Sequence, residues 1–233
     1  MKEELQVLFE DNHIIVVVKP QNIPSQADIS GDEDMLTIIR NYLKDKYKKP
    51  GNVFVGLVHR LDRPTGGVMV FAKTSKAASR LSEAIREGEF EKTYLAVVDG
   101  KPKEDEGTYV HYLKKNTMTN MVYVVPSATD GAKRAELNYQ VLEAKGKFNL
   151  VRVQLITGRG HQIRVQMSTE GTPICGDSRY GSEDNCMLAL WAAQIKFEHP
   201  TTKQRMVFIA YPPEEIAPWN SFDIDRHLNL KLF

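Results

Sequence analysis

The 233-residue sequence has only two cysteines, Cys175 and Cys186. Two thiols are too few for a disulfide framework, so we expect reduced cysteines in a cytoplasmic protein. The N-terminus, MKEELQVLFEDNH, lacks the apolar core of a signal peptide and the Arg/Ser-rich amphipathic pattern of an organelle-targeting sequence. No apolar run reaches membrane-spanning length. These absences predict a protein that is neither exported nor embedded in a membrane.

A glycine-rich nucleotide fingerprint is also missing. The GRG at Gly158–Gly160 lacks the third glycine and the preceding context of a dinucleotide-binding turn. His59, Asp62 and His161 are the candidate metal ligands, but no close acid–histidine spacing supports them. We therefore expect neither a cofactor nor a metal ion.

The net charge of +1 hides an uneven distribution along the chain. Residues 1–35 contain eight acids and two lysines, whereas residues 36–103 contain fourteen Lys or Arg and seven acids. A basic middle in a neutral protein is typical of a face that binds a polyanion. A solvated surface with patchy charge explains the same counts, so charge alone does not decide between the two.

Hydrophobic periodicity predicts few helices and many short strands. Helices are expected after an Asp34 cap with Pro50-Gly51 as the stop, after a Ser75 cap with Gly88 as the stop, and in a segment ending at Gly171. Strands are expected over 13–20, 52–60, 67–73, 92–100, 107–115, 120–127, 135–144, 148–157, 188–200 and 204–213. No linker or repeat appears. The prediction is an α+β fold: a single domain over residues 1–233 with a long, mostly antiparallel mixed β-sheet flanked by a few helices.

One carboxylate stands out in the segment GLVHRLDRPTGG, residues 56–67. Asp62 lies in a turn between two apolar runs, where a carboxylate loses hydration and must find a charge partner or stay protonated. Arg60, Arg63 or Arg164 are available as that partner. The pattern indicates a paired, partly buried aspartate, and by itself it leaves a structural role open.

Two further segments place polar side chains together. In TGRGHQIRVQM, His161 and Arg164 are three residues apart and share a face of the expected helix. In KTYLAVV, Lys92 and Tyr94 share one face of the expected strand. The alternatives are a core aromatic for Tyr94 and a capping or packing role for His161.

These segments together resemble the RluA-type family of pseudouridine synthases. HRLDRPTGG is similar to the family's catalytic-aspartate motif HRLDxxTSG, GRGHQIRVQM to GRxHQIRxH, and GTPICGDSRYG to GxPIxGDxxYG. NHIIVVVKPQNIPS and KTYLAVVDG resemble the family's opening strand and loop and its tyrosine motif. The resemblance runs in the same order from about Leu8 to Tyr211. Several motifs in one order are a far more specific signal than any one of them.

The resemblance implies an isomerase that converts uridine to pseudouridine in structured RNA, tRNA and/or rRNA, in an active-site cleft across the sheet. It implies that Asp62 is the essential catalytic carboxylate and that Arg164 pairs with it. Tyr94 is implied to stack against the target base and is a candidate for the proton transfer at C5. Arg60 fits the position that fills the space left by the flipped uridine.

The same resemblance implies further contacts with RNA. These are assigned to His59, Arg63, Arg159, His161 and Gln162. The sequence departs from the family pattern at Gly66, Gln166 and Trp191, where a serine, a final histidine and an LHA segment are usual. On this resemblance we expect the chain to begin at the catalytic domain, without the N-terminal accessory RNA-binding domain of many relatives. We expect a cytoplasmic monomer.

A carboxylate suits this reaction because it can stabilise or trap an electron-poor sugar carbon. Attack on that carbon and removal of a sugar proton are both open. The base must leave its stack, at a cost on the order of a few kcal/mol. Two other functions use the same residues: a catalytically inactive RNA-binding or assembly protein on this fold, and a metal-dependent hydrolase built on His59, Asp62 and His161.

Overall fold

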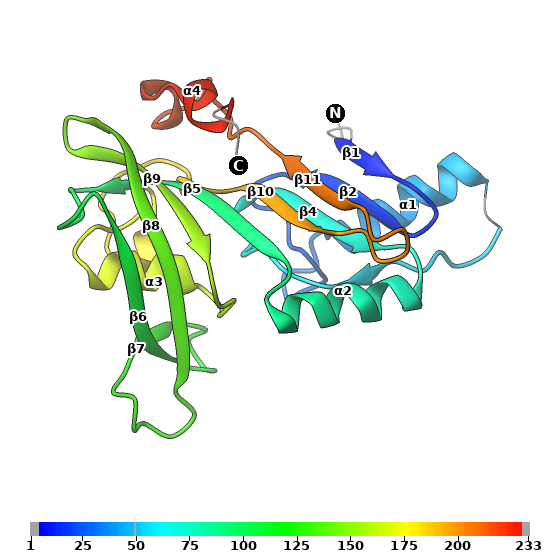
Figure 1. Ribbon diagram of the computed structural model, residues 1–233, viewed down its shortest axis with the longest axis horizontal. Helices are drawn as coiled ribbons and strands as arrows, with labels where there is room; N and C mark the ends of the chain where they lie inside the picture. Colours follow the sequence, from blue (N-terminus) through cyan, green and yellow to red (C-terminus); the bar gives the residue numbers. More distant parts are fainter. Residues whose placement is uncertain (1–4, 49, 230–233) are drawn as a thin grey trace. The chain divides into compact units, whose positions relative to one another are not determined.

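The computed structural model describes residues 5–48 and 50–229, and Figure 1 shows the arrangement of the elements within it. The chain divides into two compact units. Unit 1 comprises Met1–Glu91 and Ala192–Ala210, and unit 2 comprises Lys92–Trp191 and Tyr211–Phe233. Unit 1 is therefore built from two separate stretches of sequence.

Unit 1 is a sheet with two helices. Its strand order is β1 (Val7–Glu10), β2 (Ile14–Lys19), β4 (Gly66–Ala72) and β10 (Leu190–Glu198), with β3 (Gly56–Leu57) on β4 and β11 (Arg205–Ile209) on β10. Every residue of β2 and β4 is buried, as the continuous apolar runs of these strands predict. The helices are α1 (Met35–Tyr47) and α2 (Ser75–Glu87), and α2 packs against β4.

The capping residues determine where the two helices begin. Asp34 precedes α1, and its carboxylate accepts the N–H groups of Leu36 at 2.9 Å and Thr37 at 3.3 Å, as predicted. The cap of α2 is Thr74, whose hydroxyl accepts the N–H of Ala77 at 3.1 Å. The predicted cap, Ser75, is instead the first helical residue, because the side chain one position earlier reaches the same N–H groups.

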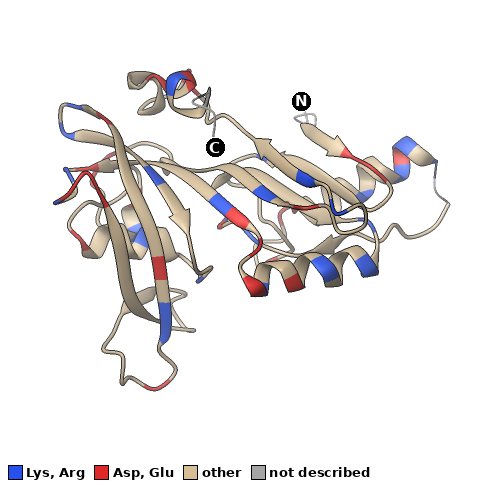
Figure 2. Cartoon of the chain, in the orientation of Figure 1, with Lys and Arg blue, Asp and Glu red and all other residues tan. Residues whose placement is uncertain are grey.

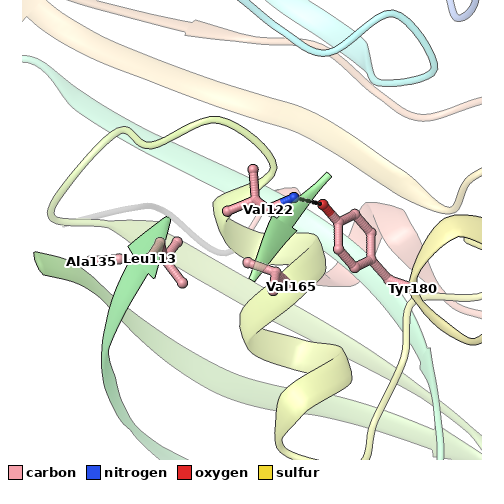
Figure 3. Packing of buried hydrophobic residues seen from close by; sticks show 5 residues of the cluster. All are labelled: Leu113, Val122, Ala135, Val165 and Tyr180. Carbon is pink, nitrogen blue, oxygen red and sulfur yellow. Dashed lines mark hydrogen bonds between the residues drawn. The ribbon is translucent and has the colours of Figure 1, made fainter. Parts of the chain in front are cut away.

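Unit 2 contains five antiparallel strands whose order in the sheet differs from their order in the sequence. The strand order is β5 (Glu91–Asp99), β9 (Phe148–Leu155), β8 (Lys133–Lys145), β6 (Glu106–Lys115) and β7 (Val122–Val124). The helical elements are α3 (Gln162–Thr169), α4 (Ile224–Asn229) and the 3₁₀ turns η1 (Ser178–Tyr180) and η2 (Trp219–Ser221). Residues of α3, β6, β7, β8 and η1 form a buried cluster, shown in Figure 3, that consists of Leu113, Val122, Ala135, Val165 and Tyr180.

The predicted α+β class with a mostly antiparallel sheet is confirmed. The strand predicted over 52–60 is wrong in extent, because only Gly56–Leu57 pairs as β3. Beyond it, the imidazole of His59 accepts the N–H of Val70 on β4 at 3.1 Å, so a side chain takes the place of a backbone partner. The single domain over residues 1–233 stays a prediction.

Candidate active site

Asp62 lies in a tight turn between β3 and β4 of unit 1. The turn closes with the Thr65 N–H donating to the Asp62 carbonyl at 2.9 Å, and the Asp62 residue is half-buried. Gly67 follows with φ +122°, and a Cβ there would lie 2.3 Å from the Ala192 carbonyl oxygen. Only glycine fits this close approach, which accounts for the second glycine of the RPTGG segment.

The buried side chain of Lys19 supports the Asp62 turn through hydrogen bonds. The Lys19 ammonium, on a side chain with 0% exposure, donates to the carbonyls of Pro20 at 2.8 Å, Arg63 at 3.0 Å and Thr65 at 2.8 Å. Burial lowers the pKa of Lys19 to about 7, while the negative charge of Asp62 opposes that change. Lys19 therefore both fixes the backbone around Asp62 and interacts with its charge.

The loop after β2 holds the remaining carbonyls of the turn. The Asn22 N–H donates to Arg63 at 2.8 Å, the Gln21 amide to Pro64 at 2.8 Å, and the Ser25 hydroxyl to Leu61 at 2.8 Å. With the bonds from Lys19 and Thr65, every carbonyl from residue 61 to residue 65 accepts a hydrogen bond. A turn bound at each peptide unit keeps one conformation, which a positioned catalytic group requires.

Arg63, beside Asp62, is held by an acidic turn. Its guanidinium donates to the Ser30 hydroxyl at 2.9 Å, pairs with Asp32, and lies 3.8 Å from an Asp28 oxygen. The hydrogen bond from Arg63 lowers the pKa of Asp32. All three charged side chains are substantially exposed, so RNA phosphate can compete for this arginine.

His59 and Arg60 precede the turn and have different surroundings. The ring of His59 lies 5.4 Å from the ring of Phe90, and its Nε2 accepts the Val70 N–H. This ring is therefore part of the packing of unit 1. Arg60 is exposed, as expected for a side chain that contacts a ligand.

In unit 2 the central pair is Arg164 with Asp177. Nε and Nη2 of Arg164 each donate to one oxygen of the Asp177 carboxylate at 2.7 Å, and the two side chains are 5% and 1% exposed. Such a bidentate pair fixes the guanidinium plane. Gly176, the residue before Asp177, has φ +78°, and a Cβ on it would lie 2.5 Å from the Cys186 carbonyl oxygen. The backbone that positions Asp177 therefore requires glycine at this point.

Tyr180 links three parts of unit 2. Its hydroxyl accepts the Val122 N–H at 3.0 Å, drawn as a dashed line in Figure 3, and lies 2.8 Å from Nδ1 of His161. Its ring centroid lies 5.1 Å from Cζ of Arg164. His161 adopts φ +53°, a left-handed conformation that costs a non-glycine residue on the order of 1 kcal/mol.

The turn before α3 is held by a glutamine. The side-chain carbonyl of Gln162 accepts from the Thr157 hydroxyl at 2.8 Å and the Arg159 N–H at 2.9 Å, and its amide donates to the Glu136 carbonyl at 3.0 Å. Gln162 is 2% exposed, which does not suit the RNA contact predicted for it. The guanidinium of Arg159 is exposed and donates to the Arg134 carbonyl at 2.9 Å.

Tyr94 lies on β5, opposite Val153 of β9, and is 6% exposed. Two residues earlier on the same strand, burial lowers the pKa of Lys92.

Gln166, where the sequence departs from the family pattern, lies in the protein interior. The residue is fully buried, and its amide donates to the Tyr109 carbonyl at 3.2 Å and contacts Nδ1 of His111 at 3.1 Å.

The predicted site residues thus fall into two groups. Unit 1 holds His59, Arg60, Asp62 and Arg63, and unit 2 holds Tyr94, Arg159, His161, Gln162 and Arg164. The predicted pairing of Arg164 with Asp62 joins the two groups and stays a prediction. The sequence reasoning missed the supporting residues Lys19, Gln21, Ser25, Asp177 and Tyr180. All of them lie inside segments recognised by resemblance, which was the available signal.

Two findings concern ligands and membranes. Within residues 5–48 and 50–229, no group of three or more His, Cys, Asp or Glu is placed to hold a metal ion. Among the helices in the same residues, none has the length and apolar character needed to cross a bilayer.

Known proteins resemble this chain along most of its length. The family model for RNA pseudouridylate synthase matches residues 13–169. An uncharacterized RNA pseudouridine synthase of Bacillus subtilis, YjbO, is 35% identical over 219 residues, which cover 91% of this chain and 74% of the relative. The ribosomal large subunit pseudouridine synthase C of Salmonella typhimurium is 35% identical over 211 residues, covering 86% of this chain and 64% of the relative.

Solved structures extend the likeness to the fold. Human RNA pseudouridylate synthase domain containing 4 superposes with a TM-score of 0.75 at 22% identity, covering 90% of this chain and 89% of that one. Human RNA pseudouridylate synthase domain containing 1 gives 0.73 at 24% identity, covering 91% and 84%. The family match spans both the Asp62 turn and α3, and the predicted resemblance to RluA-type enzymes is confirmed. The chain belongs to the RNA pseudouridylate synthase family.

Proposed function

We propose that the chain isomerises specific uridines in structured RNA to pseudouridine, with Asp62 as the essential catalytic carboxylate. The observation that supports this role best is the construction of the Asp62 turn. Its five consecutive carbonyls, from residue 61 to residue 65, are all hydrogen-bonded, and buried Lys19 supplies two of these bonds. A catalytic group must be held this firmly, because small displacements of a reacting group are costly.

The reaction of this family is an isomerisation. The bond between uracil nitrogen and the sugar breaks, the base turns, and a bond from the sugar to carbon replaces it, with no oxidation and no group donor. Asp62 acts on the sugar, either by attack on its electron-poor carbon or by removal of a sugar proton. Both routes need an ionised carboxylate that is poorly hydrated and well oriented.

The other catalytic assignments follow the resemblance. Two nitrogens of Arg164 donate to Asp177. We propose that the positive charge of the same guanidinium also stabilises the ionised carboxylate of Asp62. Tyr94 stacks against the base and is the candidate for the proton transfer at C5. Arg60, which is exposed, fills the space left by the flipped uridine.

The RNA contacts are proposed for His59, Arg63, Arg159 and His161. Gln162 is removed from this set and assigned to the support of the turn before α3, because its amide is buried and bound by protein groups. Ribosomal RNA is the substrate to test first, since a relative at 35% identity is named a ribosomal large subunit pseudouridine synthase. Transfer RNA is the second. We further propose a cytoplasmic monomer that acts without a cofactor.

Asp62→Asn tests the assignment. The amide keeps the size of the carboxylate, so the turn should stay folded, but it is a far weaker nucleophile and base. We expect RNA binding to persist and pseudouridine formation to fall to background. Melting temperature, RNA affinity and pseudouridine yield are measured on one preparation.

Asp105→Asn is the matched control, because Asp105 is an exposed carboxylate that pairs with the exposed Lys101, four residues earlier. This variant should keep the wild-type yield. A folded, RNA-binding Asp62→Asn protein with wild-type yield would overturn the assignment. A wild-type protein that binds RNA but forms no pseudouridine would instead indicate the inactive RNA-binding alternative.

A further inference from the structure

Tyr180 is a buried side chain to which the proposed chemistry gives no role. Its ring lies against the guanidinium of Arg164, with 5.1 Å between the centroid and Cζ. Asp177, three residues earlier on the same loop, binds the edge of that guanidinium with two bonds of 2.7 Å. Asp177 and Tyr180 therefore hold Arg164 by its edge and by its face, which fixes the plane as well as the position of the group.

The hydroxyl of Tyr180 has a second role at His161. Its oxygen accepts the N–H of Val122 at 3.0 Å and is hydrogen-bonded to Nδ1 of His161, 2.8 Å away. A phenol hydroxyl both donates and accepts, so this hydrogen bond can form with either tautomer of the imidazole. The hydroxyl thus fixes the orientation of the His161 ring.

These contacts join the turn before α3 to the strand β7. His161 is the residue before α3, it has φ +53°, and its side chain makes no capping hydrogen bond to the helix. Val122, on the short strand β7, and Tyr180 both belong to the buried cluster in Figure 3, so the hydroxyl is anchored in a packed region.

We infer that Tyr180 is a positioning residue of the pseudouridine synthase reaction: its ring orients Arg164 and its hydroxyl orients His161. The inference rests on the proposed function, in which Arg164 acts with Asp62 and His161 contacts RNA. The two roles use different atoms of one side chain, and two substitutions separate them.

Tyr180→Phe removes the hydroxyl and keeps the ring against Arg164. We expect the KM for RNA to rise about threefold to tenfold, the range that one hydrogen bond supplies, with kcat nearly unchanged. Tyr180→Leu removes the ring as well, and kcat should fall by a further factor of about three to thirty. A change of KM in the first variant and of kcat in the second is a pattern that loss of packing does not produce.

A double-mutant cycle tests the route through His161. If the hydroxyl acts through that ring, Tyr180→Phe should raise KM in the wild-type background and have almost no effect in His161→Ala. Independent, additive effects of the two substitutions would overturn the inference. This cycle tests whether the Tyr180 hydroxyl acts through His161 even if Tyr180→Leu does not fold.

Tyr139→Phe is the matched control. Tyr139 is a buried tyrosine of β8 in the same unit, hydrogen-bonded to Tyr109. Its variant should lose some melting temperature and keep both KM and kcat. If Tyr180→Phe behaves like Tyr139→Phe, Tyr180 is structural only. A wild-type protein that forms no pseudouridine contradicts the proposed function itself, so the two failures are distinguishable.

Discussion

Nε and Nη2 of Arg164 both donate to the carboxylate of Asp177, which is 1% exposed. A lysine in its place keeps the charge but presents one ammonium, so it cannot form two parallel bonds to Asp177. Because a buried carboxylate that loses its partner is costly, we expect Arg164→Lys to lower the free energy of unfolding by about 2–4 kcal/mol. Pseudouridine formation should fall at least about tenfold, since the orientation of the guanidinium is lost.

Urea unfolding and pseudouridine yield measure the two effects. Arg80→Lys is the control, because Nη1 of Arg80 on α2 donates to the Pro200 carbonyl at 2.8 Å, a bond that a lysine can replace. Normal stability and normal yield in Arg164→Lys would mean that the bidentate geometry is dispensable.

The partner of Arg164 illustrates what sequence can and cannot predict for single residues. The HQIR pattern identified Arg164, and the resemblance supplied Asp62 as its partner. The Asp177 pairing lies thirteen residues further along the chain and depends on a turn through Gly176. Hydrophobic periodicity does not indicate which of the thirty acidic residues such a turn places next to Arg164. Lys19 was missed for a similar reason, because a lysine at a strand end is usually exposed.

The first strand, the first helix and the end of β4 are joined by one carboxylate. Glu10 of β1 accepts from Lys46 at 2.7 Å and Tyr47 at 2.8 Å on α1, and from Lys73, just after β4, at 2.6 Å. Burial alone would raise its pKa, but these donors outweigh burial and lower the pKa of Glu10 to about 2. The group therefore binds a proton less readily in the folded state than in the unfolded state.

The sign of the pH dependence follows. Glu10 contributes stability above its unfolded pKa of about 4.5, and this contribution is lost as pH falls through about 2. We expect Glu10→Gln to be less stable at pH 7 and to lose less stability between pH 4.5 and 2 than the wild type. Thermal unfolding over this pH range measures the change in stability with pH. Glu87→Gln, at an exposed position of α2, is the control. Parallel curves for wild type and Glu10→Gln would contradict the assignment.

Elements with a strong local signal were predicted well, and those that depend on distant partners were not. The apolar run of β2 and the Asp34 cap of α1 carry their structure in their own residues. The segment 52–60 has the composition of a strand, but His59 bonds to β4 through its side chain and ends the pairing. β7 has only three residues, and the hydroxyl of Tyr180 accepts the N–H of the first of them, Val122.

Charge over the whole chain bears on RNA binding. Figure 2 shows both basic and acidic segments on α2, so the basic middle predicted from sequence is not uniformly basic. Phosphate contacts release counterions, and affinity for RNA should therefore fall as salt rises. We expect a linear decrease of log affinity with log salt between about 50 and 200 mM, measured by filter binding. An affinity that does not change with salt would contradict a basic RNA-binding face within residues 36–103.

Unit 1 consists of two stretches of sequence, and this has a consequence during synthesis on the ribosome. β4 is paired with β2 on one edge, but most of its other edge receives β10, which leaves the ribosome after about 100 residues of unit 2. At roughly 5–20 residues per second, the nascent chain carries an incomplete sheet for about 5–20 seconds. An open, fully apolar strand is a template for wrong pairing. Ribosome-associated chaperones are therefore expected to bind nascent chains in the interval before Ala192 emerges.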